Sequence, residues 1–166
     1  MMPDSSKGYT TYDSVAVARF LVALANERGV FLNITKVQKL LYISYGVGLA
    51  AFGQRIADES PRAWPYGPVF PKTREALIGS DFGAVTFDGS PDLSLMKRDE
   101  RLYSCVASAL KTFGSWTAGQ LTAWSHKKGS PWWRVAEEDL NAWNSPIPDD
   151  YIVAYFSKFV KKKGDE

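Results

Sequence analysis

The stretch from Thr35 to Pro71, TKVQKLLYISYGVGLAAFGQRIADESPRAWPYGPVFP, decides the fold of this 166-residue chain. Its first half places apolar residues on nearly every side of a helix, and its second half ends in a bend that contains three prolines, residues 64–71. A helix that is apolar nearly all round is covered by neighbours on several faces. We therefore expect a central core helix that begins at Asn33 or Thr35 and ends near Gly53.

Two glycines interrupt this helix. Gly46 and Gly48 would each destabilise an exposed helix by about 1 kcal/mol relative to alanine. Their presence inside a buried helix indicates that something lies very close to its surface. We expect the backbone of another element to approach the helix at these two positions.

The proline bend is predicted to be rigid. Pro65, Pro68 and Pro71 each fix φ, remove an amide donor and keep the preceding residue out of the helical region. We therefore predict no hydrogen-bonded regularity over 64–71, and we place a small hairpin upstream of it, within 53–64. Pro71 is well suited to begin a short helix that runs through Leu77.

Capping residues predict helices on both sides of this stretch. Asp13 is a good N-cap for a helix from Ser14 to about Arg28, and Gly29 is a good stop. The capping box that begins at Thr117 opens another helix, expected to end near 128–129. The region over 79–97 is loop-like, with an expected edge strand over 84–87. Further helices are expected over 99–114 and 134–143, and Asp149 or Asp150 is expected to cap a last helix.

Together these patterns predict an all-α single domain built around the core helix, with room for a small β-hairpin. A chain of this length fits one domain with one hydrophobic core. We expect a flexible N-terminal arm over 1–12, the helical domain over 13–160 and a basic, polar C-terminal tail over 161–166.

Composition narrows the class of protein. The hydrophobic content of 45% predicts a well-filled core, and the net charge of +2 does not by itself indicate a polyanionic partner. A single cysteine, Cys105, excludes an internal disulfide and is typical of a reducing compartment. No apolar run is long enough to span a membrane and no leader pattern opens the sequence, so we expect a cytoplasmic protein.

The sequence offers little for catalysis. It contains one histidine, His126, and one cysteine, so it cannot build a His/Cys metal cluster, and it lacks phosphate-binding glycine loops. Adjacent acidic residues at 58–59, 137–138 and 149–150 are typical of turns and helix starts. We therefore expect a protein that is not an enzyme and uses no cofactor and no metal.

A nucleic-acid interface is an alternative prediction. Lys36, Lys39, Lys72 and Arg74 flank the aromatic bend, and further lysines over 158–163 end the chain. A basic surface interleaved with aromatic side chains suits phosphate contact and base stacking. The near-neutral charge balance weighs against it, but a regulator that binds nucleic acid stays open, as does an unrelated protein partner.

Three motifs give the chain a family resemblance. They are Lys36-x-Gln38-Lys39-Leu40-Leu41-Tyr42, then Ala63-Trp64-x-Tyr66-Gly67-Pro68-Val69-x-Pro71, then Leu121-Thr122-x-x-Ser125-His126 with Gly129-Ser130-Pro131-Trp132. With these motifs the chain resembles the Panacea domain family, which includes SocA-like and phage-associated GepA-type proteins. The match runs from about Asp13 to Phe159. It departs from the family pattern at Ser125, where threonine is expected, and at Arg74, near a position that is commonly aromatic.

The resemblance implies a mostly α-helical antitoxin without enzymatic activity. Members of the family neutralise a toxin by direct binding, the toxin being encoded by the adjacent gene. SocA-like members further imply a proteolytic adaptor that passes the toxin to the ClpXP protease. For this chain, the implied partners are therefore a cognate toxin and, as an extension, ClpXP.

The resemblance also separates contact residues from supporting ones. Our hypothesis places the partner surface at Lys36, Lys39, Trp64, Tyr66, Phe70 and Arg74. The supporting motif residues are Gln38, Leu41, Tyr42, Gly67, Pro68, Val69, His126, Pro131 and Trp132. An alternative interpretation is that Trp64 and Tyr66 only fasten the bend to the core helix. We expect His126 and Trp132 to brace the second corner, 129–133, against the first.

Overall fold

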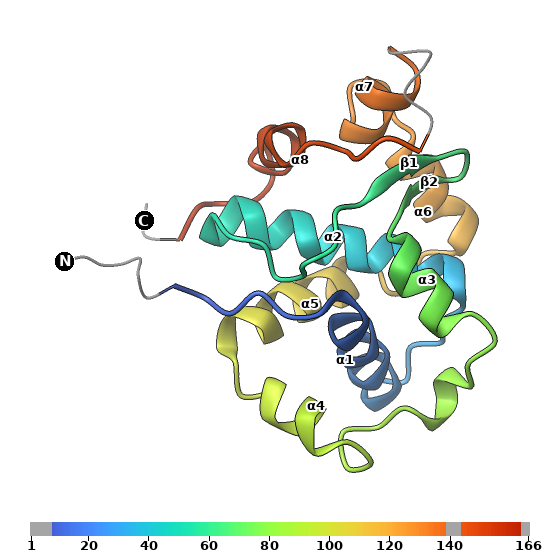
Figure 1. Cartoon of the computed structure of the whole chain (residues 1–166), viewed down its shortest axis with the longest axis vertical. Coiled ribbons are helices and arrows are strands. Elements are labelled where there is room, and N and C mark those ends of the chain that lie inside the picture. The colour runs from blue at the N-terminus through green and yellow to red at the C-terminus, as the bar shows by residue number, and fades with distance from the viewer. Residues whose placement is uncertain (1–7, 139–143, 164–166) are drawn as a thin grey trace.

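The core helix crosses the middle of the molecule. The computed structural model describes residues 8–138 and 144–163, and in it α2, Ile34–Phe52, lies between the other elements (Figure 1). The side chain of Asn33 caps its first turn by accepting from the backbone N–H of Lys36 at 2.9 Å, and Gly53 ends it with φ 74°. Fifteen of its 19 residues are buried, which confirms the prediction of a central helix.

Helices cover α2 on several sides. In Figure 1, α1 and α5 lie on one side of it and α8 on the other. α1, Ser14–Glu27, and α6, Ala118–Ser125, have the predicted caps, Asp13 and the capping box of Thr117 with Gln120. α5, Glu100–Phe113, is capped by Asp99, and α8 spans Asp149–Phe156. The described part of the chain is thus mainly helical, as predicted, and none of its helices is both long and apolar enough to cross a membrane.

The two glycines of α2 accommodate side chains. A Cβ atom added at Gly46 would lie 2.4 Å from Cε2 of Phe156, and one at Gly48 would lie 2.8 Å from Cγ2 of Ile56. The expectation of a neighbouring backbone was therefore wrong. Gly46 instead lets the Phe156 ring of α8 rest directly on α2, where it also meets the Tyr42 ring edge-on at 5.6 Å.

The second strand of the hairpin lies in the proline bend. β1, Arg62–Trp64, pairs antiparallel with β2, Gly67–Val69, so the prediction of an irregular bend was wrong, and the expected hairpin begins inside 53–64 but extends into the bend. Ala63 stands opposite Pro68 and directs its N–H and C=O the other way, to Ser145 and Asn144 at 2.9 and 2.8 Å. Proline is compatible with a strand at such a position, because its missing N–H is not needed there.

The segment after the hairpin is more helical than predicted. α3, Pro71–Leu77, agrees with expectation. The predicted strand over 84–87 is absent, because a 3₁₀ turn, Phe82–Ala84, precedes it and the Phe87 ring packs edge-on against Phe20 in the core. Pro91 then opens a helix instead of a loop: α4, Pro91–Met96, is capped by the Ser90 side chain.

In the last third of the chain, three helix boundaries differ from the predicted ones. α6 ends at Ser125, before the expected 128–129. α7, Pro131–Ala136, begins before the expected residue 134, because the Ser130 hydroxyl accepts from the N–H of Trp133, and the predicted end at 143 lies outside the described residues. Residue 148, a proline, is the N-cap of α8, so neither Asp149 nor Asp150 caps it.

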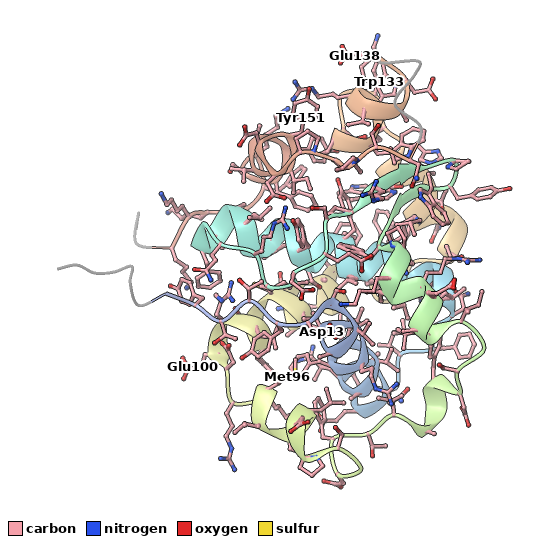
Figure 2. The ribbon with its side chains drawn as sticks, viewed as in Figure 1. Asp13, Met96, Glu100, Trp133, Glu138 and Tyr151 are labelled. Atoms are coloured by element: carbon pink, nitrogen blue, oxygen red, sulfur yellow. The ribbon has the colours of Figure 1, made fainter. Side chains whose placement is uncertain are left out.

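Two contacts hold α8 in place. The Asp149 carboxylate accepts from the Tyr45 hydroxyl at 2.6 Å and from Nε of Arg55 at 2.7 Å. At its other side, the guanidinium of Arg134 on α7 lies 3.7 Å from the centroid of the Tyr151 ring on α8. Figure 2 shows Tyr151 and the α7 residue Trp133 at the same end of the molecule.

The described part of the predicted N-terminal arm, residues 8–12, runs along the segment that follows α2. Tyr12 exchanges backbone hydrogen bonds of 2.9 Å with Ile56 and Asp58, and its hydroxyl donates to Asp99 at 2.6 Å. The next residue, Asp13 at the start of α1 (Figure 2), pairs with Lys72 of α3 at 2.9 Å. Glu59 also joins α1 to α3. Its carboxylate accepts from the Ser14 hydroxyl at 2.9 Å and from both the amide and the hydroxyl of Thr73.

The contact between Phe156 and Gly46 gives a test of the packing. We expect Gly46→Ala to lower the free energy of unfolding by about 1–3 kcal/mol, because the added methyl group would displace a packed aromatic ring. Gly119→Ala is the matched control, since its Cβ would meet only the Thr117 hydroxyl at 3.9 Å. Urea unfolding would measure both, and a Gly46→Ala variant as stable as the wild type would contradict this packing.

Candidate partner-binding groove

A groove of about 630 Å³ opens beside the first half of α2. It lies between α2, the hairpin, α3 and α6, which Figure 1 shows gathered at one side of the molecule. We call it the hairpin groove. Its lining residues are Ile34, Thr35, Gln38, Lys39, Trp64, Pro65, Tyr66, Val69, Arg74, Ala118, Gly119 and Thr122. The structure therefore brings together four of the six predicted partner residues, namely Lys39, Trp64, Tyr66 and Arg74.

The rim of the groove is aromatic and cationic. Tyr66, in the turn between the two strands, is 76% exposed. Trp64 is half-buried, and its indole Nε1–H donates to the side chain of Asn144 at 2.8 Å. The guanidinium of Arg74, on α3, lies 5.9 Å from the centroid of the Trp64 ring. Trp64 is thus fastened to the fold and also presents a face to the groove, so its two predicted roles are compatible.

The side chain of Gln38 fixes the end of the hairpin. Its Oε1 accepts from the backbone N–H of Phe70 at 2.7 Å, and its Nε2 donates to the carbonyl of Phe70 at 3.4 Å. The Phe70 side chain points into the core, fully buried, with its ring edge-on to Tyr45 at 5.6 Å. Phe70 therefore lies behind the groove and does not reach the surface where we expected a contact.

Lys39 forms part of the inner wall. Its side chain is only 2% exposed, and its Nζ donates to the carbonyl of Pro68 at 3.3 Å. Burial disfavours the charged ammonium and lowers the pKa of Lys39 to about 8. Gly67 makes room for this side chain, because a Cβ there would lie 2.6 Å from the Ser125 hydroxyl and 2.9 Å from Cε of Lys39, and its φ is 111°.

Lys36 lies away from the groove. Its Nζ donates to the backbone carbonyl of Gly114 at 2.8 Å, at the end of α5. A lysine at this place satisfies a free carbonyl and is favoured by the helix dipole. Burial lowers the pKa of Lys36. Lys36 thus joins α2 to α5 and, like Phe70, does not line the groove.

The second proline corner packs against the first. The Trp132 indole Nε1–H donates to the carbonyl of Trp64 at 2.7 Å, and the rings of Trp132 and His126 stack at 3.9 Å. Pro131 opens α7 and is buried. Burial and the neighbouring charge of Lys39 lower the pKa of His126, which favours the neutral ring.

The remaining motif residues fill the core and the groove wall. Leu41 is fully buried and Tyr42 is 1% exposed on α2. Val69, on β2, is 6% exposed and lines the hairpin groove.

Some residues of the groove were missed by the sequence interpretation. Ala118, Gly119 and Thr122 come from α6, and Asn144, which holds Trp64, comes from the far side of the hairpin. The capping box at Thr117 located the start of α6, but nothing local placed that helix beside residue 38. Asn144 has a φ of 65°, a left-handed value that asparagine adopts more readily than most residues other than glycine, but nothing in the sequence places its side chain beside Trp64.

Two observations concern reactive groups among the described residues. No group of three or more His, Cys, Asp or Glu side chains in this part of the chain could hold a metal ion. The Cys105 thiol is buried, and burial raises its pKa to about 12, which suppresses the reactive thiolate.

The buried ammonium of Lys39 makes stability depend on pH. Its pKa is lowered from 10.5 in the unfolded chain to about 8 in the fold, so the fold loses the proton first as pH rises and its stability increases between these values. We expect the wild type to gain about 2 kcal/mol relative to Lys39→Met between pH 7 and 9.5. Lys111→Met, at an exposed lysine, is the control.

Denaturant unfolding at several pH values would measure this difference. Comparison with Lys39→Met cancels the titration of Cys105 and the tyrosines, which both proteins share. Parallel profiles for the two proteins would show that Lys39 has an ordinary pKa and is not buried.

Comparisons with known proteins identify the family. A family model described as antitoxin SocA-like, Panacea domain, matches residues 37–133, which is more than half of the chain. Antitoxin SocA from Caulobacter vibrioides (strain NA1000 / CB15N) is 27% identical over 139 residues, covering 79% of this chain and 74% of that protein. No solved structure gives a significant match. The matched residues contain the hairpin, Gln38 and the second corner, so the chain belongs to the Panacea domain family of SocA-like antitoxins.

Proposed function

We propose that this chain neutralises a cognate toxin by binding it directly, and that the hairpin groove is the contact surface. Membership of an antitoxin family supports a toxin as the partner. The observation that carries the choice of surface is the rim of the groove, where Tyr66 is 76% exposed next to Trp64 and Arg74. Tyrosine, tryptophan and arginine are the residues that most often dominate binding energy at protein interfaces.

The support behind the rim favours tight binding. Prolines restrict the hairpin, Gln38 bonds both backbone groups of Phe70, and Trp132 and Asn144 hold Trp64 from behind. A surface that is rigid before binding loses little conformational entropy when the partner arrives. The groove is small compared with a standard interface of about 800 Å² per partner, so we propose that it receives one protruding segment while surrounding surface completes the contact.

The geometry weighs against the nucleic-acid alternative. Of the four cations expected to flank the bend, Lys36 and Lys39 are buried and bonded to backbone carbonyls, and Lys72 pairs with Asp13 at 2.9 Å. Arg74 is left at the groove, with its guanidinium 5.9 Å from the centroid of the Trp64 ring. Nucleic-acid binding depends on several cations that follow the phosphate backbone. We therefore propose a protein partner, and on the basis of family membership a non-enzymatic role.

Co-expression with the adjacent open reading frame tests this function. We expect the neighbouring product to stop growth when expressed alone, and this chain to restore growth and to co-purify with it. Absence of toxicity, or rescue without a complex, would contradict direct neutralisation.

A pair of variants tests the surface. Tyr66→Ala should weaken the complex by at least about tenfold, because truncating an interface anchor typically removes more than about 1.4 kcal/mol. Phe159→Ala is the control, since that ring is 58% exposed beyond α8 and outside the groove. Calorimetry would measure both affinities, and equal effects of the two variants would exclude the groove.

Delivery to ClpXP is a separate step, which we propose as an extension of neutralisation. The half-life of the toxin, measured with this chain present and with or without ClpX, would test it. A half-life that does not depend on ClpX would leave blocking as the whole mechanism.

A further inference from the structure

The charged residues of the hairpin groove all have one sign. Lys39 lies on its inner wall and Arg74 on its rim, whereas no aspartate or glutamate is among its described lining residues. Elsewhere in the described chain, cations meet carboxylates within the fold, as in the pairs Arg55–Asp149, Lys72–Asp13 and Lys97–Glu27. The two cations of the groove have no such counter-charge among its described lining residues.

Lys39 is poorly satisfied for a buried cation. An ammonium has three donors, and the described structure gives Lys39 one acceptor, the Pro68 carbonyl at 3.3 Å. Lys36, by comparison, holds its acceptor at 2.8 Å. A buried charge is destabilising unless it is paired, so a carboxylate that entered the groove would supply what Lys39 lacks.

Arg74 offers a second set of donors at the rim. Its guanidinium lies over the Trp64 ring, and no carboxylate in the described chain pairs with it. A guanidinium presents five N–H donors in a fixed plane that matches carboxylate geometry. Its position over the Trp64 ring places these donors beside the groove.

We propose that the hairpin groove binds an acidic segment of the protein partner, with its carboxylates at Lys39 and Arg74 and an apolar neighbour against Trp64. The inference rests on the proposed function for the identity of the partner, but not for the chemistry of the groove. The apolar walls, formed by residues such as Ile34 and Val69, favour a peptide over a phosphate backbone. Two cations are also few for a nucleic-acid track.

A pair of short peptides tests this chemistry without any toxin. One is acetylated and amidated and carries two glutamates between two leucines, and the other carries glutamines in their place. We expect the acidic peptide to shift the NMR signals of the Trp64 indole and the Thr35 and Gly119 amides, and to bind about tenfold more tightly than the glutamine peptide at 150 mM salt. A single-stranded oligonucleotide serves as the competing anion.

Variants assign the effect to the two cations. Arg74→Gln and Lys39→Met should each reduce the preference for the acidic peptide about threefold, because the two cations share the tenfold difference. The control is Arg28→Gln, because Arg28 also lies over an aromatic ring, that of Tyr103 at 5.8 Å, but outside the groove. If Lys39→Met does not fold, Arg74→Gln on the half-buried rim still tests whether the groove cations cause the preference for the acidic peptide.

Several results would overturn the inference: no binding of either peptide, equal binding of both, shifts on another surface, or stronger shifts of the same signals by the oligonucleotide. The outcome of the co-expression test does not depend on the outcome of the peptide test. A groove that prefers the acidic peptide in a chain that does not rescue growth would refute the antitoxin mechanism and leave the groove chemistry standing. Rescue of growth together with equal binding of both peptides would support the antitoxin mechanism and refute the groove chemistry.

Discussion

The pair of hydrogen bonds between the Gln38 amide and the backbone of Phe70 is the interaction on which the hairpin groove depends. The bonds measure 2.7 and 3.4 Å and join the buried core helix to the end of β2. Leaving such backbone groups buried and unbonded would destabilise the fold by about 1–3 kcal/mol each. They fix the hairpin over α2 and turn the Phe70 ring into the core, so that Trp64 and Tyr66 are left at the rim. The groove thus exists because a two-stranded sheet, too small to be stable alone, is bonded to a helix.

Local patterns predicted the helices well. The apolar periodicity of α2, the caps at Asp13 and Thr117, and the stops at Gly29 and Gly53 depend on short-range geometry, which the sequence states directly. Pro68 shows why the second strand of the hairpin was missed. Proline argues against a strand until it is known which way the opposite residue, Ala63, directs its polar groups, and that depends on Asn144 and Ser145 about 80 residues away.

The site was predictable in part for the same reason. The aromatic bend identified Trp64 and Tyr66, but the lysines of the first motif were taken for surface cations. Lys36 and Lys39 lie on a helix whose other positions are almost all buried, so their ammonium groups end at backbone carbonyls instead of water. A long side chain can place its charge several ångströms from its own Cα atom. Which carbonyl it reaches is set by tertiary packing, which a single sequence does not reveal.

The bond from the Trp132 indole to the Trp64 carbonyl joins residues 68 positions apart, and it has a consequence for synthesis of the protein. When the hairpin has just emerged from the ribosome, Trp132 and Asn144 are not yet available to hold Trp64. Phe156, which covers α2, is also missing. The hairpin groove is therefore completed only when translation is nearly over. Products of premature termination carry the hairpin sequence without its support, and they leave the ribosome unable to present the groove.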